Sequence, residues 1–218
     1  MNLSIFSTKE DARMNELLLT TAEALKRRGF ESEVFATAKE AADYVRRDLP
    51  ANADIAFGGS MTSKQLGLET LLREDGHTVL WHWEVAPAER YELLHKAMQC
   101  PYYICSANAL TEDGLIVQID GTGNRVAALC YGPDTVYMLV GRNKIVKGGY
   151  QQAVARCKQY ACPQNARRYN LDTPCAKTDK CNAAECKSSL CHAFLALELK
   201  PIGIKTMKVL LIDEDLGY

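Results

Sequence analysis

The sequence lacks several features that would place it in a class at once. No apolar run approaches the roughly 20 residues of a membrane-spanning helix, no signal-peptide core follows Met1, and no repeat or low-complexity tract is visible. Neither sign of charge is in excess, because 26 lysines and arginines stand against 27 aspartates and glutamates. Such a balance argues against broad electrostatic binding of nucleic acid or of an acidic membrane. We therefore expect a cytoplasmic protein that does not insert into a membrane.

A dinucleotide-binding motif is also missing. No GxGxxG follows the first predicted strand, and Gly58-Gly59-Ser60 does not replace it. The chain therefore has no flavin or nicotinamide motif, which argues against a stand-alone dehydrogenase.

The first half of the chain alternates strands and helices, and 47% of all residues are apolar, as in ordinary globular proteins. Apolar spacing, capping residues and glycine or proline stops predict helices over 9–29, 38–49, 61–74 and 87–98, and strands over 32–36, 54–57, 77–83 and 101–106. Strands separated by helices of this length indicate a mainly parallel sheet with helices on both faces. We expect one α/β domain over 1–218.

The second half predicts a different pattern. A β-hairpin is expected over 109–119 around Glu112-Asp113-Gly114, followed by a helix over 126–130, a strand over 135–140 and a helix over 150–161. Strands over 194–199 and 205–212, joined around Pro201 and Gly203, are expected to close the fold as an antiparallel pair.

Three polar loops follow predicted strands, at 58–62, 120–125 and 141–144. Open α/β sheets bind ligands beyond the carboxyl ends of their strands, so we expect the three loops to converge on one rim. The candidate ligand-binding residues are Gly58, Gly59, Ser60, Thr62, Gly121, Thr122, Gly123, Asn124, Arg125, Asn143 and Lys144.

Each of the first two loops has two interpretations. The glycines at 58 and 59 would let the backbone approach an anion at a helix start, or they form only a tight turn capped by Ser60. Arg125 would hold a carboxylate or phosphate through paired hydrogen bonds, with Asp120 as general base or as the group that orients Arg125. Alternatively, Asp120 and Arg125 form a structural ion pair at a capped helix start.

Glu112, at the predicted hairpin tip, is a second candidate catalytic carboxylate. It has this role only if the hairpin folds over the cleft, since a carboxylate at a hairpin tip is otherwise solvated surface.

Four of the nine cysteines lie close together in a polar loop, 172–192. Lysines between them favour thiolates, and four thiolates suit an iron–sulfur cluster or tetrahedral zinc. The spacings match neither a zinc ribbon nor a bacterial ferredoxin, so structural thiols and regulatory disulfides remain alternatives. Of the other five, two flank a predicted helix end (Cys157 and Cys162) and three read as buried apolar residues (Cys100, Cys105 and Cys130). The candidate metal ligands are Cys175, Cys181, Cys186 and Cys191.

Three segments carry a resemblance to a known family. The stretches ANALTEDGLIVQIDGTGNRVAAL…YGPDTVYMLVGRNKIV, FGGSMTSKQLG and TPCAKTDKCNAAECKSSLC resemble the lactate-utilization (LUD, LutC-like) domain family, over roughly 25–218. The resemblance implies a fold shared with ribose-5-phosphate isomerase, glucosamine-6-phosphate deaminase, coenzyme A transferases and translation initiation factor 2B. It also implies an association with oxidation of lactate to pyruvate beside iron–sulfur subunits, which favours an iron–sulfur cluster over zinc.

Three functions stay open. The first is a redox-associated subunit of organic-acid utilization, with lactate as the leading substrate and iron–sulfur subunits as partners. The second is an isomerase-like or coenzyme A transferase-like enzyme that acts on a small anionic metabolite, with Asp120 or Glu112 as base or nucleophile. The third is a non-catalytic module for ligand sensing or assembly.

Overall fold

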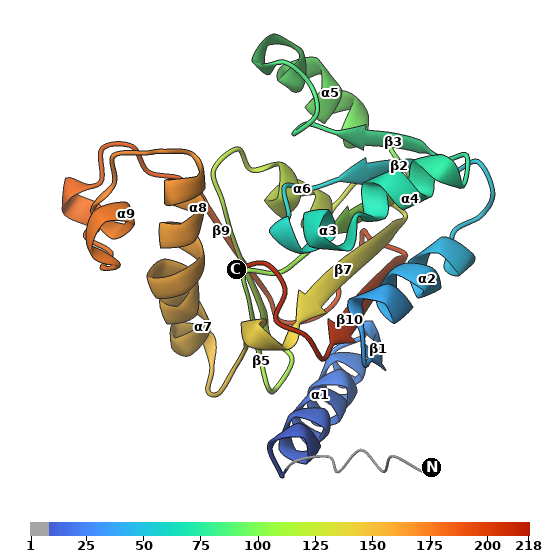
Figure 1. The fold of residues 1–218 in the computed structure, drawn as a ribbon, viewed down its shortest axis with the longest axis horizontal. Coiled ribbons are helices and arrows are strands. Elements are labelled where there is room, and N and C mark those ends of the chain that lie inside the picture. Colours follow the sequence, from blue (N-terminus) through green and yellow to red (C-terminus); the bar gives the residue numbers. More distant parts are fainter. Residues whose placement is uncertain (1–8) are drawn as a thin grey trace, which may run out of the picture.

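The computed structural model describes residues 9–218, which are built around a six-stranded parallel sheet, here sheet A (Figure 1). All its neighbouring strands run parallel, which confirms the predicted fold class. The strand order across the sheet is β1 (Glu31–Phe35), β10 (Thr206–Ile212), β7 (Thr135–Gly141), β4 (Tyr102–Cys105), β2 (Asp54–Phe57) and β3 (Thr78–Trp81).

Helices cover both faces of sheet A, and the buried strand β7 shows why. Its side chains point alternately to the two faces, as in any strand, and both faces are apolar. Val136, Met138 and Val140 join one core cluster, whereas Tyr137 and Leu139 join the other. The first cluster is covered by α1 (Lys9–Arg27), α5 (Arg90–Ala97) and α6 (Asn124–Cys130), and the second by α2 (Ala38–Asp48), α3 (Met61–Leu66) and α4 (Leu68–Glu74).

A second, mixed sheet of four strands, sheet B, packs beside the first. Its order is β8 (Ile145–Val146), β5 (Ala109–Thr111), β6 (Ile116–Asp120) and β9 (Ala193–Leu197). The antiparallel pair β5–β6 is the predicted hairpin. One face of sheet B contributes Leu110 and Ile116 to the first core cluster, and the other packs on α7 (Tyr150–Arg156).

The predicted C-terminal antiparallel pair is wrong. Strand β9 pairs antiparallel with β6 in sheet B, whereas β10 lies parallel between β1 and β7 in sheet A. The burial patterns explain the separation. Residues of β9 alternate between exposed and half-buried, as at a sheet edge, but β10 is apolar on both faces and needs cover on both.

Two helix predictions also change. The helix expected over 61–74 is broken into α3 and α4 at Gly67, whose φ of 60° is left-handed. The helix expected to end at 161 continues through a π-helical turn, Cys157–Ala161, into α8 (Cys162–Arg168). The π turn ends two residues before Pro163, which has no N–H to donate to a regular helical hydrogen bond.

The segment 172–192 contains little regular structure. It holds the short helix α9 (Pro174–Thr178) and one 3-10 turn, Ala183–Glu185, and most of its residues are exposed. The segment lies beside α8, drawn in orange in Figure 1.

Candidate functional site

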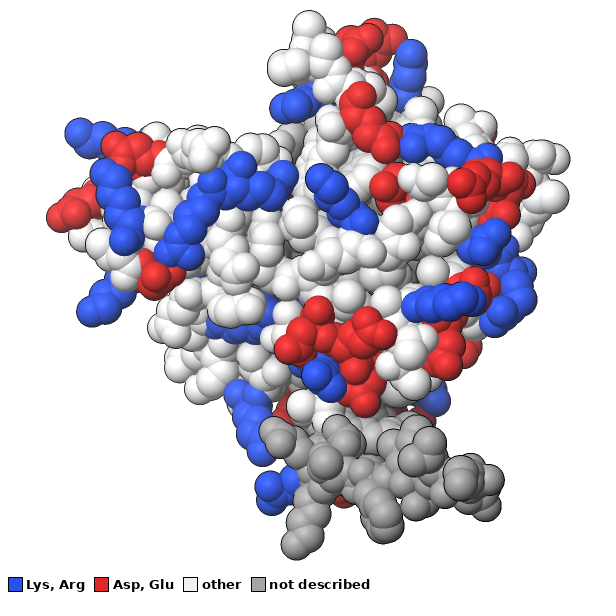
Figure 2. Space-filling view, in the orientation of Figure 1, with Lys and Arg blue, Asp and Glu red and all other residues white. Residues whose placement is uncertain are grey.

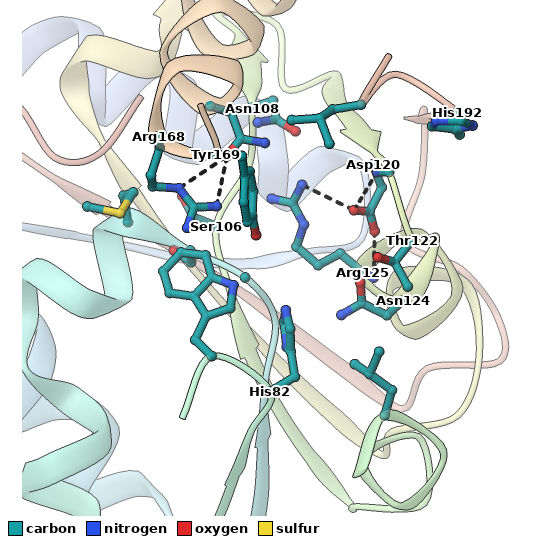
Figure 3. A pocket seen from close by; sticks show the side chains of 18 of the residues that line it. His82, Ser106, Asn108, Asp120, Thr122, Asn124, Arg125, Arg168, Tyr169 and His192 are labelled. Carbon is teal, nitrogen blue, oxygen red and sulfur yellow. Dashed lines mark hydrogen bonds and ion pairs between the residues drawn. The ribbon is translucent and has the colours of Figure 1, made fainter. Parts of the chain in front are cut away.

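A cavity of about 560 Å³, here the central cavity, lies where the carboxyl ends of sheet A strands meet sheet B and α8 (Figure 3). All three predicted polar loops reach it, which confirms that they converge. Eight of the predicted ligand-binding or catalytic residues line it: Gly59, Ser60, Asp120, Gly121, Thr122, Asn124, Arg125 and Lys144.

The other predicted residues of these loops lie behind the wall of the cavity. Thr62 is fully buried and contacts Lys144, while Asn143 donates a hydrogen bond to the carbonyl of Gly217 and accepts one from the N–H of Leu216. Gly58 and Gly123 belong to the backbone of the two glycine loops. These four residues support the side chains that form the wall of the central cavity.

Glu112 does not belong to the site. It lies at the tip of the β5–β6 hairpin, where its N–H bonds to the carbonyl of Val146, whereas Asp120 is at the opposite end of β6. The neighbouring Asp113 is paired with Arg28 at the end of α1. The hairpin therefore packs against α1 and does not fold over the cavity, so the prediction of a catalytic Glu112 is wrong.

Asp120 anchors the second loop. Its carboxylate accepts hydrogen bonds from the backbone N–H of Gly121 (3.0 Å) and of Arg125 (2.9 Å), which is the second residue of α6. One of its oxygens also lies 3.5 Å from the Arg125 guanidinium. This is the structural ion pair that the sequence left open as an alternative, and each oxygen of the carboxylate accepts one backbone N–H.

The Arg125 side chain lies between β6 of sheet B and the glycine loop that follows β2 of sheet A. Its guanidinium donates to the carbonyl of Ile119 at 2.9 Å, and its side chain is 12% exposed. A Cβ atom at Gly58 would lie 2.7 Å from the Arg125 side chain and 2.9 Å from the Tyr103 hydroxyl. Gly58 is therefore required for the close approach of Arg125, and Ser60 caps the N-terminus of α3 by accepting from the N–H of Ser63.

Lys144 is a buried amine in the wall of the cavity. Its Nζ donates to Thr62 Oγ1 (2.9 Å), Ser106 Oγ (2.8 Å) and the carbonyl of Ala107 (3.1 Å), and the residue is 2% exposed. Burial, followed by repulsion from Arg156 and Arg125, lowers the pKa of Lys144 well below its ordinary value. The amine therefore gives up its proton more readily than a surface lysine does.

Sequence reasoning missed His82 and Trp83, which follow β3 and line the cavity. Burial, and next the charge of Arg90, lower the pKa of His82 to about 4, so the imidazole is neutral near pH 7. His82 Nδ1 and Trp83 Nε1 are buried without a hydrogen-bond partner among the described residues. These two atoms are buried behind the surface of the cavity, and Trp83 Nε1 packs against Gly59.

The opposite wall comes from α8 and the C-terminal segments. The Arg168 guanidinium stacks between the rings of Trp83 (4.3 Å) and Tyr169 (4.0 Å) and donates to the hydroxyl of Tyr218 (2.8 Å) (Figure 3). Leu190 and His192 complete this wall. No local pattern marks these residues, because they reach the site only through the extension of the helix to Arg168 and the placement of β9.

Cationic side chains dominate the central cavity. Arg90, Arg125, Lys144 and Arg168 line it, whereas Asp120 is its one carboxylate side chain among residues 9–218. By contrast, acidic and basic side chains are interspersed on the face shown in Figure 2, and the whole chain has a net charge of −1. The excess of positive charge is thus a local property of the cavity and favours an anionic ligand.

The four predicted metal ligands lie outside the central cavity, in a smaller cavity together with Cys162. Cys175 is buried, Cys181 is exposed, and Cys186 and Cys191 are half-buried. Within the described part of the chain, no three histidine, cysteine, aspartate or glutamate side chains are grouped closely enough to hold a single metal ion.

Two expectations for the remaining cysteines are wrong. Cys130 is exposed, although Cys100 and Cys105 are buried as predicted, and Cys157 and Cys162 lie within a continuing helix. Of the helices between residues 9 and 218, none has the length and apolar character needed to cross a membrane.

Fold and site together define an α/β domain with a basic ligand cavity beyond its strand ends. Residues 18–212 match the family model for the LUD domain, so the chain belongs to the LUD-domain family. Among solved structures, the chain is similar to a DUF162 family protein from Deinococcus radiodurans, with 13% identity and a TM-score of 0.55. The match covers 91% of this chain and 98% of that one, and at this identity it shows the fold alone. No curated protein matches the sequence.

Proposed function

We propose that this LUD-domain protein acts in organic-acid utilization by binding the carboxylate of a small organic acid in the central cavity, with lactate as the leading ligand. The observation that carries the proposal is that three arginines and the amine of Lys144 line the cavity around a single carboxylate, which is itself bound to Arg125. Arginine guanidinium groups are well suited to bind a carboxylate through paired hydrogen bonds.

Two of the three arginines that line the cavity, Arg125 and Arg168, differ in how accessible they are to a ligand. Arg125 is 12% exposed, donates to Ile119 and lies beside Asp120. Arg168 also donates to Tyr218 and Asn165, but it is exposed and contacts two aromatic rings. We assign Arg168 as the main contact for the carboxylate, and Arg125 as the buried charge that favours the anion from behind. The neutral His82 and the amine of Lys144 would then contact the hydroxyl or oxo group of the acid.

The volume of the central cavity indicates the size of ligand that it can hold. A volume of about 560 Å³ suits a ligand of drug-like size, and lactate would fill only part of it. The cavity therefore has room for a second reactant beside the acid or for a larger acid. Because the sequence contains no flavin or nicotinamide motif, oxidation of the acid would require an electron-accepting partner, for which we propose an iron–sulfur subunit.

A second candidate function, proton transfer on an anionic substrate as in isomerases, rests on Lys144. Its amine lines the cavity, and its pKa is lowered by burial and by two nearby arginines, so it can act as a base. In this proposal Lys144 takes the role that the sequence assigned to Asp120, whose carboxylate is engaged by backbone N–H groups.

Calorimetric titration of the protein with lactate, pyruvate, a sugar phosphate and the neutral analogue lactamide tests these proposals. We expect the organic acids to bind and lactamide not to bind. Arg168→Gln should weaken acid binding about tenfold or more, because it removes a charge-assisted hydrogen bond of about 1.5–3 kcal/mol.

The matched control is Arg46→Gln, which removes a guanidinium that pairs with Asp75 outside the central cavity and should leave affinity unchanged. Equal affinity for lactate and lactamide, or no binding of any acid, would contradict the first proposal. Turnover of the sugar phosphate in the same samples, lost in Lys144→Met, would favour the isomerase-type function.

A further inference from the structure

A second cavity, of about 240 Å³ and here called the cysteine cavity, lies between α8 and the segment 172–192. Five of the nine cysteines line it, one from α8 and four from the segment. Two of these five thiols touch, because the Sγ atoms of Cys162 and Cys191 lie 3.4 Å apart. Among the described residues, they are the one pair of thiols in hydrogen-bonding contact, which separates them from the other three.

The other three thiols of the cavity have different surroundings. Cys175 is buried, and its Sγ lies 3.3 Å from the hydroxyl of Thr173. Cys181 is exposed and Cys186 is half-buried, and both lie on the irregular part of the segment. A reaction between two thiols is therefore favoured by position at Cys162 and Cys191.

The contact between Cys162 and Cys191 is close to the geometry of a disulfide. A disulfide holds its sulfurs about 2.05 Å apart, so the two sulfurs need to approach by about 1.4 Å. Cys162 is the first residue of α8, whereas Cys191 lies outside any helix or strand, two residues before β9. One partner is thus fixed on a helix, and the other belongs to a stretch whose backbone can adjust.

Both cysteines are accessible from the cysteine cavity. They are half-buried and line it, so a small molecule that enters the cavity can reach either sulfur. Lys158, in the π turn that precedes α8, lines the same cavity. A cation beside a cysteine favours the thiolate, which is the nucleophile of thiol–disulfide exchange.

We propose that Cys162 and Cys191 form a redox-active pair, which a low-molecular-weight disulfide oxidises to a disulfide between α8 and the stretch before β9. The thiolate of one cysteine attacks a sulfur of the small disulfide, forms a mixed disulfide with it and releases one small thiolate. The thiolate of the second cysteine then attacks the sulfur of the first, which breaks the mixed disulfide and releases the second small thiolate. Two electrons and two protons thus pass from the pair to the small disulfide, which leaves as two thiols.

The pair lies next to the wall of the central cavity. Cys191 stands between Leu190 and His192, which both line that cavity, and the N–H of His192 donates to the carbonyl of Asp120 at 3.0 Å. Helix α8 begins at Cys162 and carries Arg168, which lines the central cavity, at its other end. The disulfide would therefore join two parts of one wall of the ligand site.

Peptide mapping of the full chain, oxidised with glutathione disulfide and then alkylated, tests the proposal. Trypsin releases the two cysteines on separate peptides, 159–167 and 188–205, and each peptide contains no other cysteine. We expect these two peptides, linked to each other, to be the main disulfide product. Cys162→Ser should lose the linked product and leave Cys191 as a mixed disulfide with glutathione.

The matched control is Cys130→Ser, which removes an exposed cysteine outside both cavities and should keep the linked product. In the wild-type protein, Cys130 also reports that the oxidant has reacted, so the result does not depend on how well any variant folds. A main disulfide between other cysteines would overturn the proposal. So would recovery of both peptides with alkylated thiols under conditions that modify Cys130.

An effect on the central cavity is a further consequence, and it rests on the proposed binding of an organic acid there. Joining the two parts of the wall reduces the freedom that the wall loses when a ligand binds, so oxidised protein should bind lactate about two- to tenfold more tightly than reduced protein. Calorimetric titration of both forms measures the ratio, and equal affinities would refute the link between the pair and the ligand site. A linked product without binding of any acid would contradict the proposed function alone, whereas acid binding without the linked product would contradict the redox pair alone.

Discussion

The two cavities of this LUD domain differ in how their walls are built. The central cavity is walled by side chains fixed to strand ends: Lys144 is held by three oxygen atoms, and Asp120 is held by two backbone N–H groups. The cysteine cavity is walled on one side by 172–192, a segment with little regular structure and mostly exposed residues. The comparison indicates that hydrogen bonds at the strand ends hold the walls of the first cavity in place, whereas one wall of the second is an irregular and mostly exposed segment.

The largest expected effect is a difference in the free energy of unfolding between two leucine variants, one in sheet A and one in the segment between the cavities. Leu139 in the middle of β7 is fully buried, so Leu139→Ala should lower the free energy of unfolding by about 2–5 kcal/mol. Leu190 is half-buried where it lines the central cavity, so Leu190→Ala should cost less than about 1 kcal/mol. Denaturant unfolding of the two variants and the wild-type protein measures both. Similar losses of unfolding free energy in the two variants would contradict the claim that the strand ends are held more firmly than the segment 172–192.

A smaller effect is expected on the pH dependence of the free energy of unfolding, through the amine of Lys144. Its native pKa is lowered by burial, then by Arg156 and Arg125, so between that pKa and its ordinary value of 10.5 the unfolded chain binds more protons than the native one. The stability of the wild-type protein relative to Lys144→Met should therefore rise with pH in this window, by at most about 1.4 kcal/mol per pH unit.

Unfolding of both proteins by denaturant, at several values between about pH 7 and pH 10, measures that difference. Comparing the two proteins removes the contributions of other groups, such as the buried thiols of Cys105 and Cys157, whose raised pKa values act in the opposite direction. A difference that does not change with pH would mean that the amine of Lys144 titrates as an exposed lysine does.

Much of sheet A is predictable from the sequence, because local signals and the fold agree there. Strand β2 has the predicted bounds, and Thr37 caps α2 by accepting from the N–H of Glu40. The prediction that β9 and β10 pair with each other was wrong because local signals do not decide the pairing. Pro201 and Gly203 mark a reversal of the chain, but they do not specify which sheet takes up the following strand. That choice depended on the need of β10 for cover on both faces.

The residues of the candidate site also differ in whether they can be predicted from the sequence. Arg125 follows β6 of sheet B, which pairs antiparallel with β5 and β9, so the rule for parallel strands does not explain its position. Lys144, which follows β7 of sheet A, is predictable because parallel strands bring their carboxyl ends to one edge. Arg168 and His82 are not, because nothing local shows that α8 extends past Pro163 or that His82 turns toward the cavity. Glu112 was assigned wrongly because a hairpin sequence does not reveal what its tip packs against, which here is α1.

A crystal structure of the protein with lactate or pyruvate bound tests the central claim most directly. We predict that the acid occupies the central cavity, with its carboxylate within hydrogen-bonding distance of the Arg168 or Arg125 guanidinium and its hydroxyl or oxo group near Lys144 or His82. An acid bound outside this cavity, or inside it with the carboxylate away from both arginines, would contradict the account.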